Sequence, residues 1–289
     1  MKQVLLFGGS GQLGTAMREY THGLWAVDAP TSAQVSLAGS DAVADYIAAT
    51  APQLVVNAAA YTKVDDAEVE RDLAFLVNDS APAAMARAAI AIGARFLHVS
   101  TDYVFDGHSN VPYHPSVSTH PLNTYGASKR AGELSVLAVN PSATVVRTSW
   151  VHSGRGVNFI ATAVRLLTSG KSMRVVNDQV GSPTRATNLA RALFAVSVND
   201  AISGLLHFTD AGVASWYDVA CCVLETLRDE GRLADGVTVT PVNSSAFPRP
   251  AKRPQVSLLD CHDSWTTIGW TPPHWRDGVI ASTRELLHA

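Results

Sequence analysis

Short apolar runs and longer stretches with helical spacing alternate through the first 150 residues. The runs are rich in Val, Ile and Leu, and they lie at 3–7, 24–28, 53–57, 95–100 and 143–150. Strands that are apolar on both faces are typical of a parallel sheet with helices on each side. The alternation therefore predicts an α/β protein with a Rossmann-like, doubly wound parallel sheet.

A glycine turn follows the first of these runs, in the stretch "LLFGGSGQLG". Gly8 permits a tight turn, Gly11 lets backbone N–H groups approach a pyrophosphate, and Gly14 lets the next helix pack on the strand. The N-terminus of that helix carries partial positive charge toward the phosphates. Because the turn ends a strand and opens a helix, it indicates a dinucleotide-binding site.

Asp28 ends the second run, twenty residues after Gly8. A carboxylate there can accept hydrogen bonds from the adenosine ribose. It would repel a 2′-phosphate, so this position favours NADH over NADPH. Three alanines in "NAAAYT" (57–62) leave room for a cofactor beside the end of the third run, with Asn57 tying the loop, although ordinary small-residue packing explains them equally well.

The pattern loosens after residue 150. We expect a dinucleotide-binding Rossmann domain at 1–150 and a smaller, mainly substrate-binding C-terminal domain at 151–289. Some later segments, such as 173–178, are expected to rejoin the first domain. The stretch 245–254 has three prolines and is predicted to be a loop.

Tyr125 and Lys129 are four residues apart in a predicted helix, so their side chains share a face. A free phenol has a pKa of ~10, and a nearby ammonium lowers it. The pair predicts a proton donor for a carbonyl that receives a hydride. Thr101 ends the fourth run, at the edge of the sheet where open α/β folds bind ligands, and its hydroxyl can hold that carbonyl.

Composition narrows the possible partners. A net charge of −3 with 16% charged residues gives no field of one sign, which excludes nucleic acid and anionic membranes as main partners. Three cysteines without C-x-x-C spacing indicate a reducing compartment. No apolar run approaches the ~20 residues that span a bilayer, and the N-terminal run is too short for a signal peptide. We expect a cytoplasmic protein.

The ordered motifs resemble those of the extended short-chain dehydrogenases/reductases, and among these the reductases of dTDP-4-keto sugars. The matching segments span residues 4 to 259: "LLFGGSGQLG", "VVNAAAYTKVDDAE", "HVSTDYVFDG", "PLNTYGASKRAGE", "VVRTSWVH", "NFI", "VNDQVGSPT" and "RPQVSLL". The resemblance implies reduction of the C4 ketone of dTDP-4-dehydro-6-deoxy-L-mannose to dTDP-L-rhamnose, with NADPH or NADH as cofactor.

The resemblance also implies residue roles. Tyr125 would be the general acid, Lys129 would bind the nicotinamide ribose and depress the pKa of Tyr125, and Thr101 would orient the carbonyl. The other implied contacts are Gly11, Gln12 and Leu13 with the pyrophosphate, Asp28 with the adenosine ribose, Ala59, Ala60 and Tyr61 with the cofactor, and Asp102, Tyr103 and Trp150 with the sugar. Asn158, Gln179 and Arg253 lie in matching segments without an assigned contact.

Alternatives remain. Related 4,6-dehydratases carry an Asp-Glu pair after the threonine, and Tyr103 stands here in place of the glutamate, which argues against a dehydratase. A reductase that gives dTDP-6-deoxy-L-talose stays open. So does a cofactor-binding regulatory subunit resembling the beta subunit of methionine adenosyltransferase.

The sequence gives little information on metal binding and on the oligomeric state. Some members of the family bind magnesium at a subunit contact, but the sequence shows no ligand cluster, so no metal site is predicted. The acids Asp65, Asp66, Glu68 and Glu70 are interpreted as a solvated helix face, and His114 and His120 as surface residues. A homodimer stays open.

Overall fold

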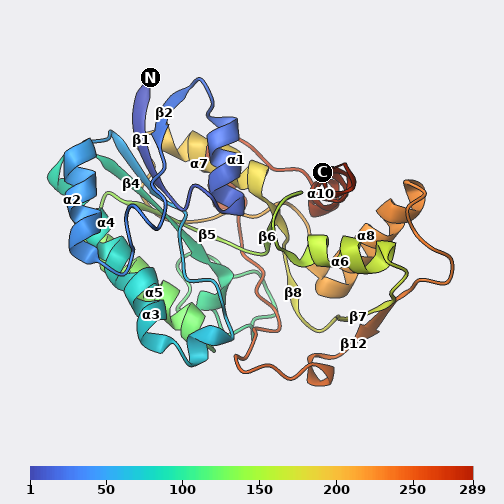
Figure 1. The fold of residues 1–289 in the computed structure, drawn as a ribbon. Helices are drawn as coiled ribbons and strands as arrows, with labels where there is room; N and C mark the ends of the chain where they lie inside the picture. Colours follow the sequence, from blue (N-terminus) through green and yellow to red (C-terminus); the bar gives the residue numbers. More distant parts are fainter. Residues whose placement is uncertain (289) are drawn as a thin grey trace.

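A six-stranded parallel sheet is the centre of the computed structural model, which describes residues 1–288 (Figure 1). The strand order is β10-β5-β4-β3-β1-β2. The strands are β1 (Lys2–Phe7), β2 (Trp25–Asp28), β3 (Leu54–Asn57), β4 (Arg95–Thr101), β5 (Thr144–Thr148) and β10 (Gly204–His207). This confirms the predicted Rossmann-like α/β fold.

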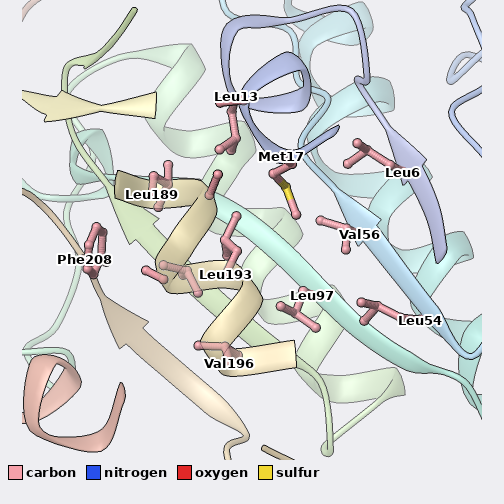
Figure 2. Packing of buried hydrophobic residues seen from close by; sticks show 14 of the residues in the cluster. Leu6, Leu13, Met17, Leu54, Val56, Leu97, Leu189, Leu193, Val196 and Phe208 are labelled. Carbon is pink, nitrogen blue, oxygen red and sulfur yellow. The ribbon is translucent and has the colours of Figure 1, made fainter. Parts of the chain in front are cut away.

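Helices cover both faces of the sheet because alternate residues of each strand point to opposite sides. Leu6 and Val56 pack with Leu13, Met17 and Leu193 (Figure 2), from α1 (Gln12–Tyr20) and α7 (Ala186–Ser197). On the other face, a second cluster joins strand residues to α2 (Ser40–Thr50), α4 (Ala81–Ala91) and α5 (Thr124–Val139). The two clusters hold the strand ends in fixed positions.

The alanine-rich segment after β3 is not one helix. It consists of η1 (Asp66–Glu68), α3 (Arg71–Phe75), the π-helical turn η2 (Leu76–Ser80) and α4. The π turn places buried Asn78 against α5, where its Nδ2 donates to Ser128 Oγ (2.9 Å). A Cβ on Gly132 would lie 2.0 Å from the carbonyl oxygen of Asn78, so only glycine allows this close approach.

A third cluster of buried residues lies outside the sheet, among α6 (Phe159–Thr168), α8 (Trp216–Asp229) and α10 (Trp275–Leu287). Three two-stranded sheets border it: β7 (Met173–Val176) with β12 (Val239–Val242), β8 (Val180–Gly181) with β11 (Ala214–Ser215), and β6 (Val151–His152) with β9 (Thr184–Arg185). The remaining elements are η3 (Asp102–Val104), η4 (Ser244–Ala246) and α9 (His262–Ile268).

The expected return of 173–178 to the first domain is wrong. β7 pairs with β12 and not with the six-stranded sheet. Its buried Met173 and Val175 alternate with exposed Arg174, which suits a strand with one covered face. The segments that do return are β10, which pairs with β5, and α7, which packs on the sheet. Within residues 1–288, no helix is both long and apolar enough to cross a membrane.

Candidate active site

A cleft of about 600 Å³ opens at the carboxyl ends of β1, β3, β4 and β5, where open α/β sheets bind ligands. It brings together most of the predicted site residues: Gly8, Gly11, Gln12, Leu13, Gly14, Ala59, Ala60, Thr101, Tyr125, Lys129 and Trp150. Asp28, Tyr61, Asp102 and Tyr103 do not line it. Segments from both halves of the first 150 residues thus meet in one hollow.

Glycine is sterically required at two of the three predicted positions of the turn. Gly8 has φ +83°, and a Cβ on it would lie 2.6 Å from Ala59 N. A Cβ on Gly14 would lie 2.1 Å from Gly8 O. Gly11 has φ −73° and room for a Cβ, with its nearest atom at 3.4 Å. As the N-cap of α1, Gly11 supplies no side-chain cap, so the first N–H groups of the helix face the cleft uncapped, as an anion site requires.

Asp28 is exposed at the end of β2, outside the cleft lining. The Tyr46 hydroxyl from α2 donates to Asp28 Oδ2 (2.9 Å), and this hydrogen bond raises the pKa of Tyr46. The sequence reading missed Tyr46, since no spacing relates it to Asp28. Its hydroxyl fixes the direction of the carboxylate.

Thr101 ends β4, and its hydroxyl donates to Asp102 Oδ1 (2.9 Å). The other carboxylate oxygen of Asp102 accepts from Ser257 Oγ (2.5 Å). Asp102 is 2% exposed, and burial raises its pKa to about 6. Asp102 therefore orients the threonine hydroxyl from behind the cleft wall, with Ser257 holding the carboxylate in turn.

Tyr125 and Lys129 lie on the same side of α5 and both line the cleft. The helix begins where the Asn123 side chain accepts from Gly126 N (2.8 Å), while Asn123 Nδ2 donates to Lys252 O (2.7 Å). A Cβ on Gly126 would lie 2.1 Å from Tyr103 O, so α5 rests directly on the loop after β4. These contacts fix the height of the Tyr125 ring above the sheet.

The electrostatics of the pair differ from the prediction. The pKa of Tyr125 is raised to about 12, mainly by burial; the Thr101 hydroxyl acts to lower it and the charge of Asp102 to raise it. Burial lowers the pKa of Lys129, which is 2% exposed, to about 8. Lys129 Nζ donates to Val99 O (2.7 Å) and lies 3.3 Å from His98 Nε2. The Tyr125 pKa is raised in this structure and not lowered, with burial of the phenol as the largest cause, and a lowering by Lys129 stays a prediction.

Tyr103 sits beside this pair, not in the cleft lining. Its ring meets that of Tyr125 edge to face, with centroids 5.7 Å apart. Arg253, from the proline-rich loop, lies near Tyr103 and donates to both oxygens of Asp65 (2.5 and 2.8 Å). The interpretation of Asp65 as part of a solvated helix face is wrong, since this ion pair is partly buried and lowers the pKa of Asp65.

The other acids near the cleft have partners as well. The Tyr61 hydroxyl donates to Glu70 Oε2 (2.6 Å), and Glu68 Oε1 accepts from Thr124 N (2.7 Å) at the start of α5. Across residues 1–288, no group of three or more His, Cys, Asp or Glu side chains is placed to hold a metal ion. His114 and His120 are exposed.

Trp150 forms one wall of the cleft in a strained conformation, with φ +48°. Its indole stacks on that of Trp216, with centroids 3.8 Å apart and planes 8° from parallel. A Cβ on Gly181 would lie 2.8 Å from the Trp150 ring. Trp216 begins α8 and packs against the third cluster, so this aromatic pair joins the cleft to the second part of the chain. The sequence reading missed Trp216.

Known proteins match the whole of this architecture. The family model described as "RmlD substrate binding domain" matches residues 1–287. The chain belongs to this family.

Three relatives illustrate the RmlD family match. The dTDP-4-dehydrorhamnose reductase of Escherichia coli is 35% identical, with 98% of both chains covered. The "Probable dTDP-4,6-dihydroxy-2-methyloxan-3-one 4-ketoreductase" of Streptomyces antibioticus is 38% identical, with 99% of this chain and 96% of the relative covered. The crystal structure of the Bacillus anthracis dTDP-4-dehydrorhamnose reductase in complex with NADP has a TM-score of 0.90 at 30% identity, covering 100% and 99%. Reductases of dTDP sugars thus share both the sequence and the fold of this RmlD-family chain.

Proposed function

We propose that this RmlD-family chain is an NADPH- or NADH-dependent dTDP-4-dehydrorhamnose reductase. It reduces the C4 ketone of dTDP-4-dehydro-6-deoxy-L-mannose and gives dTDP-L-rhamnose. The observation that carries the proposal is the meeting of Thr101, Tyr125 and Lys129 in one cleft with the glycine turn. Relatives that share the fold across their whole length bear the same activity in their names.

The cleft fits a dinucleotide. Gly8 and Gly14 leave space that a Cβ would fill, and the N-terminus of α1 has no side-chain cap. In this proposal Gly11, Gln12 and Leu13 hold the pyrophosphate, Asp28 the adenosine ribose and Lys129 the nicotinamide ribose. Ala59, Ala60 and Tyr61 also contact the cofactor. The bound cofactor supplies a hydride to C4 of the sugar.

Tyr125 supplies the proton that balances the hydride. Its raised pKa keeps the phenol protonated at neutral pH, as a proton donor requires. When C4 receives the hydride, the C4 oxygen gains negative charge and takes the hydroxyl proton of Tyr125. Thr101 turns its hydroxyl from Asp102 to that oxygen and stabilises the developing charge. Tyr103, Asp102 and Trp150 shape the space for the sugar from the side and back of the cleft.

A second candidate is reduction of a different dTDP-4-keto-6-deoxy sugar. The Streptomyces antibioticus relative, whose name gives another keto sugar, is as similar as the rhamnose-pathway reductases. The face of the ketone that is turned toward the hydride decides whether dTDP-L-rhamnose or dTDP-6-deoxy-L-talose forms. We also propose a cytoplasmic location and a homodimer.

The test is turnover of the enzymatically prepared dTDP-4-keto sugar with NADPH and, separately, NADH, followed by the loss of reduced cofactor. NMR of the product identifies the configuration at C4. We expect dTDP-L-rhamnose. A talo product supports the second candidate, and tight cofactor binding without turnover of any dTDP-4-keto sugar would support the regulatory-subunit alternative.

A further inference from the structure

Three polar side chains form a buried row beneath the cleft, and the reductase chemistry uses only the last of them. Asn57 ends β3, His98 lies on β4 and Lys129 on α5; they are 0%, 0% and 2% exposed. Asn57 Nδ2 lies 3.0 Å from His98 Nδ1, and His98 Nε2 lies 3.3 Å from Lys129 Nζ. Each ring nitrogen of His98 therefore faces a nitrogen.

A backbone hydrogen bond to Asn57 determines which atoms of this row donate and which accept. Ala59 N donates to Asn57 Oδ1 (3.1 Å), and a backbone N–H can only donate, so the amide oxygen faces Ala59 and the amide nitrogen faces His98. Nδ1 of His98 must then accept. A neutral imidazole that accepts at one nitrogen carries its hydrogen on the other, so His98 presents Nε2–H to Lys129.

An N–H that points at Lys129 disfavours the charged ammonium, because an ammonium has donors and no acceptor. A neutral amine has a lone pair for Nε2–H and still donates to Val99 O (2.7 Å). Protonation of His98 does not occur near neutral pH, because burial and the Lys129 charge hold the pKa of His98 well below its usual value.

Among residues 1–288, Glu133 is the carboxylate that favours the charged form of Lys129. Glu133 lies one turn along α5 and raises the pKa of Lys129, but less than burial lowers it. Glu133 itself pairs with Arg147 and Arg130. Several acids on elements packed against α5 have other partners: Asp102 contacts Thr101 and Ser257, Asp79 contacts Ser135, Asp66 pairs with Lys63, and Glu68 accepts from Thr124 N. Tyr125 is protonated and brings no charge.

We propose that Asn57 and His98 are positioning residues that favour the neutral amine of Lys129 over the ammonium. Binding of the reduced dinucleotide is then coupled to proton uptake at Lys129. The negative phosphates and the ribose hydroxyl oxygens of the cofactor favour the ammonium in the same cleft. This inference rests on the proposed cofactor binding and not on the identity of the sugar.

The first measurement is the dissociation constant of NADPH and of NADH between pH 6.5 and 10, by titration calorimetry in buffers of different ionisation enthalpy. With the pKa of Lys129 near 8, the affinity is expected to be flat below that pH. Above it, the dissociation constant should rise toward about tenfold per pH unit, with about half a proton taken up at the midpoint. An affinity that is independent of pH, without proton uptake, would overturn the inference. Absence of any cofactor binding would refute the proposed function itself.

The discriminating variant is Asn57→Asp. A carboxylate still accepts from Ala59 N but also accepts from His98, which moves the ring hydrogen to Nδ1 and lets Nε2 accept from the ammonium. The midpoint should shift upward by one pH unit or more. Asn140→Asp is the matched control: Asn140 is also buried, at the end of α5, but its side chain contacts Ala86 and Ser142. A midpoint that moves equally in both variants, or in neither, contradicts the roles of Asn57 and His98.

A measurement on the natural chain covers the case in which Asn57→Asp does not fold. Nitrogen-15 NMR of labelled histidine distinguishes a protonated from an unprotonated ring nitrogen, and His98 can be assigned by its proximity to the Asn57 amide. We expect Nε2 protonated and Nδ1 unprotonated. A hydrogen on Nδ1 would overturn the inference.

Discussion

The cores of this chain are built in two different ways. On both faces of the six-stranded sheet, buried residues come from neighbouring strands, four of which, β1, β3, β4 and β5, end at the cleft. The third core gathers helices from 159–168, 216–229 and 275–287 around two-residue strands and one four-residue pair. The regular part holds the groups proposed for proton and hydride transfer, and the irregular part meets them through Trp216. The groups proposed for proton transfer thus stand on the part of the fold that is built from regular strands and helices.

Tyr125→Phe gives the largest effect expected in the regular part. It removes the proton donor and leaves the ring, so turnover should fall by about 10³-fold or more while the cofactor dissociation constant changes little. Stopped-flow turnover and calorimetric binding of NADPH measure the two quantities. Unchanged turnover would show that another group donates the proton. Tyr20→Phe, at the end of α1 that lies away from the cleft lining, serves as a control.

Gly14→Ala tests how tightly the turn is packed. Its Cβ would lie 2.1 Å from Gly8 O, so the turn must move and the free energy of unfolding should fall by about 3 kcal/mol. Gly11→Ala is the matched control in the same turn, because its Cβ would meet nothing closer than 3.4 Å and the cost should stay below about 1 kcal/mol. Denaturant unfolding measures both variants, and equal losses would contradict the steric explanation.

Acid should destabilise the protein through buried histidines. His98, His152 and His207 have pKa values lowered by burial, the last two to about 3, so the unfolded state binds more protons below pH 6.5. His152 and His207 then each remove about 2 kcal/mol of stability between pH 7 and pH 5, and His98 acts in the same direction.

Two carboxyls work in the opposite direction. Burial raises the pKa of Asp102 and of Asp210 to about 6, so the folded state binds more protons between about pH 4 and 6 and stability is gained as the pH falls. The two histidines and two carboxyls with these pKa values leave a net loss of about 1 kcal/mol at pH 5, to which His98 adds. Urea unfolding at the two pH values checks this. Equal stability at both pH values would contradict the account.

Trp216→Leu gives the smallest effect and tests the irregular part. Loss of its stack on Trp150 costs about 1 kcal/mol. The KM for the dTDP sugar should rise by about fivefold, while cofactor affinity stays constant. Trp270→Leu is the control: Trp270 stacks near Phe208, away from the cleft lining, and should lower stability without changing KM. A rise in KM in both variants would assign the effect to general loosening.

The sequence could predict what depends on short-range patterns. Gly8 and Gly14 were identifiable because the turn stands between a strand and a helix, and Tyr125 and Lys129 because helical spacing puts them on one face. His98 and Ser257 were not, because their roles arise only when β3, β4 and the 255–259 segment come together. The pairing of β7 with β12 and the stack of Trp150 on Trp216 likewise join residues more than sixty positions apart. The rise in the Tyr125 pKa was not predicted because burial, its largest cause, cannot be taken from the sequence.

Two glycines allow α5 to pack closely on neighbouring main chain, and this has a practical consequence. Gly126 and Gly132 leave the helix lying against the main chain of two separate segments, at Tyr103 and at Asn78. Enlarging either residue would lift the whole helix, and the phenol on it would travel with the lift. Substitutions meant to accept other keto sugars should therefore begin at Trp150 and Trp216 and leave α5 unchanged. A shift of α5 would move the Tyr125 hydroxyl by a similar distance.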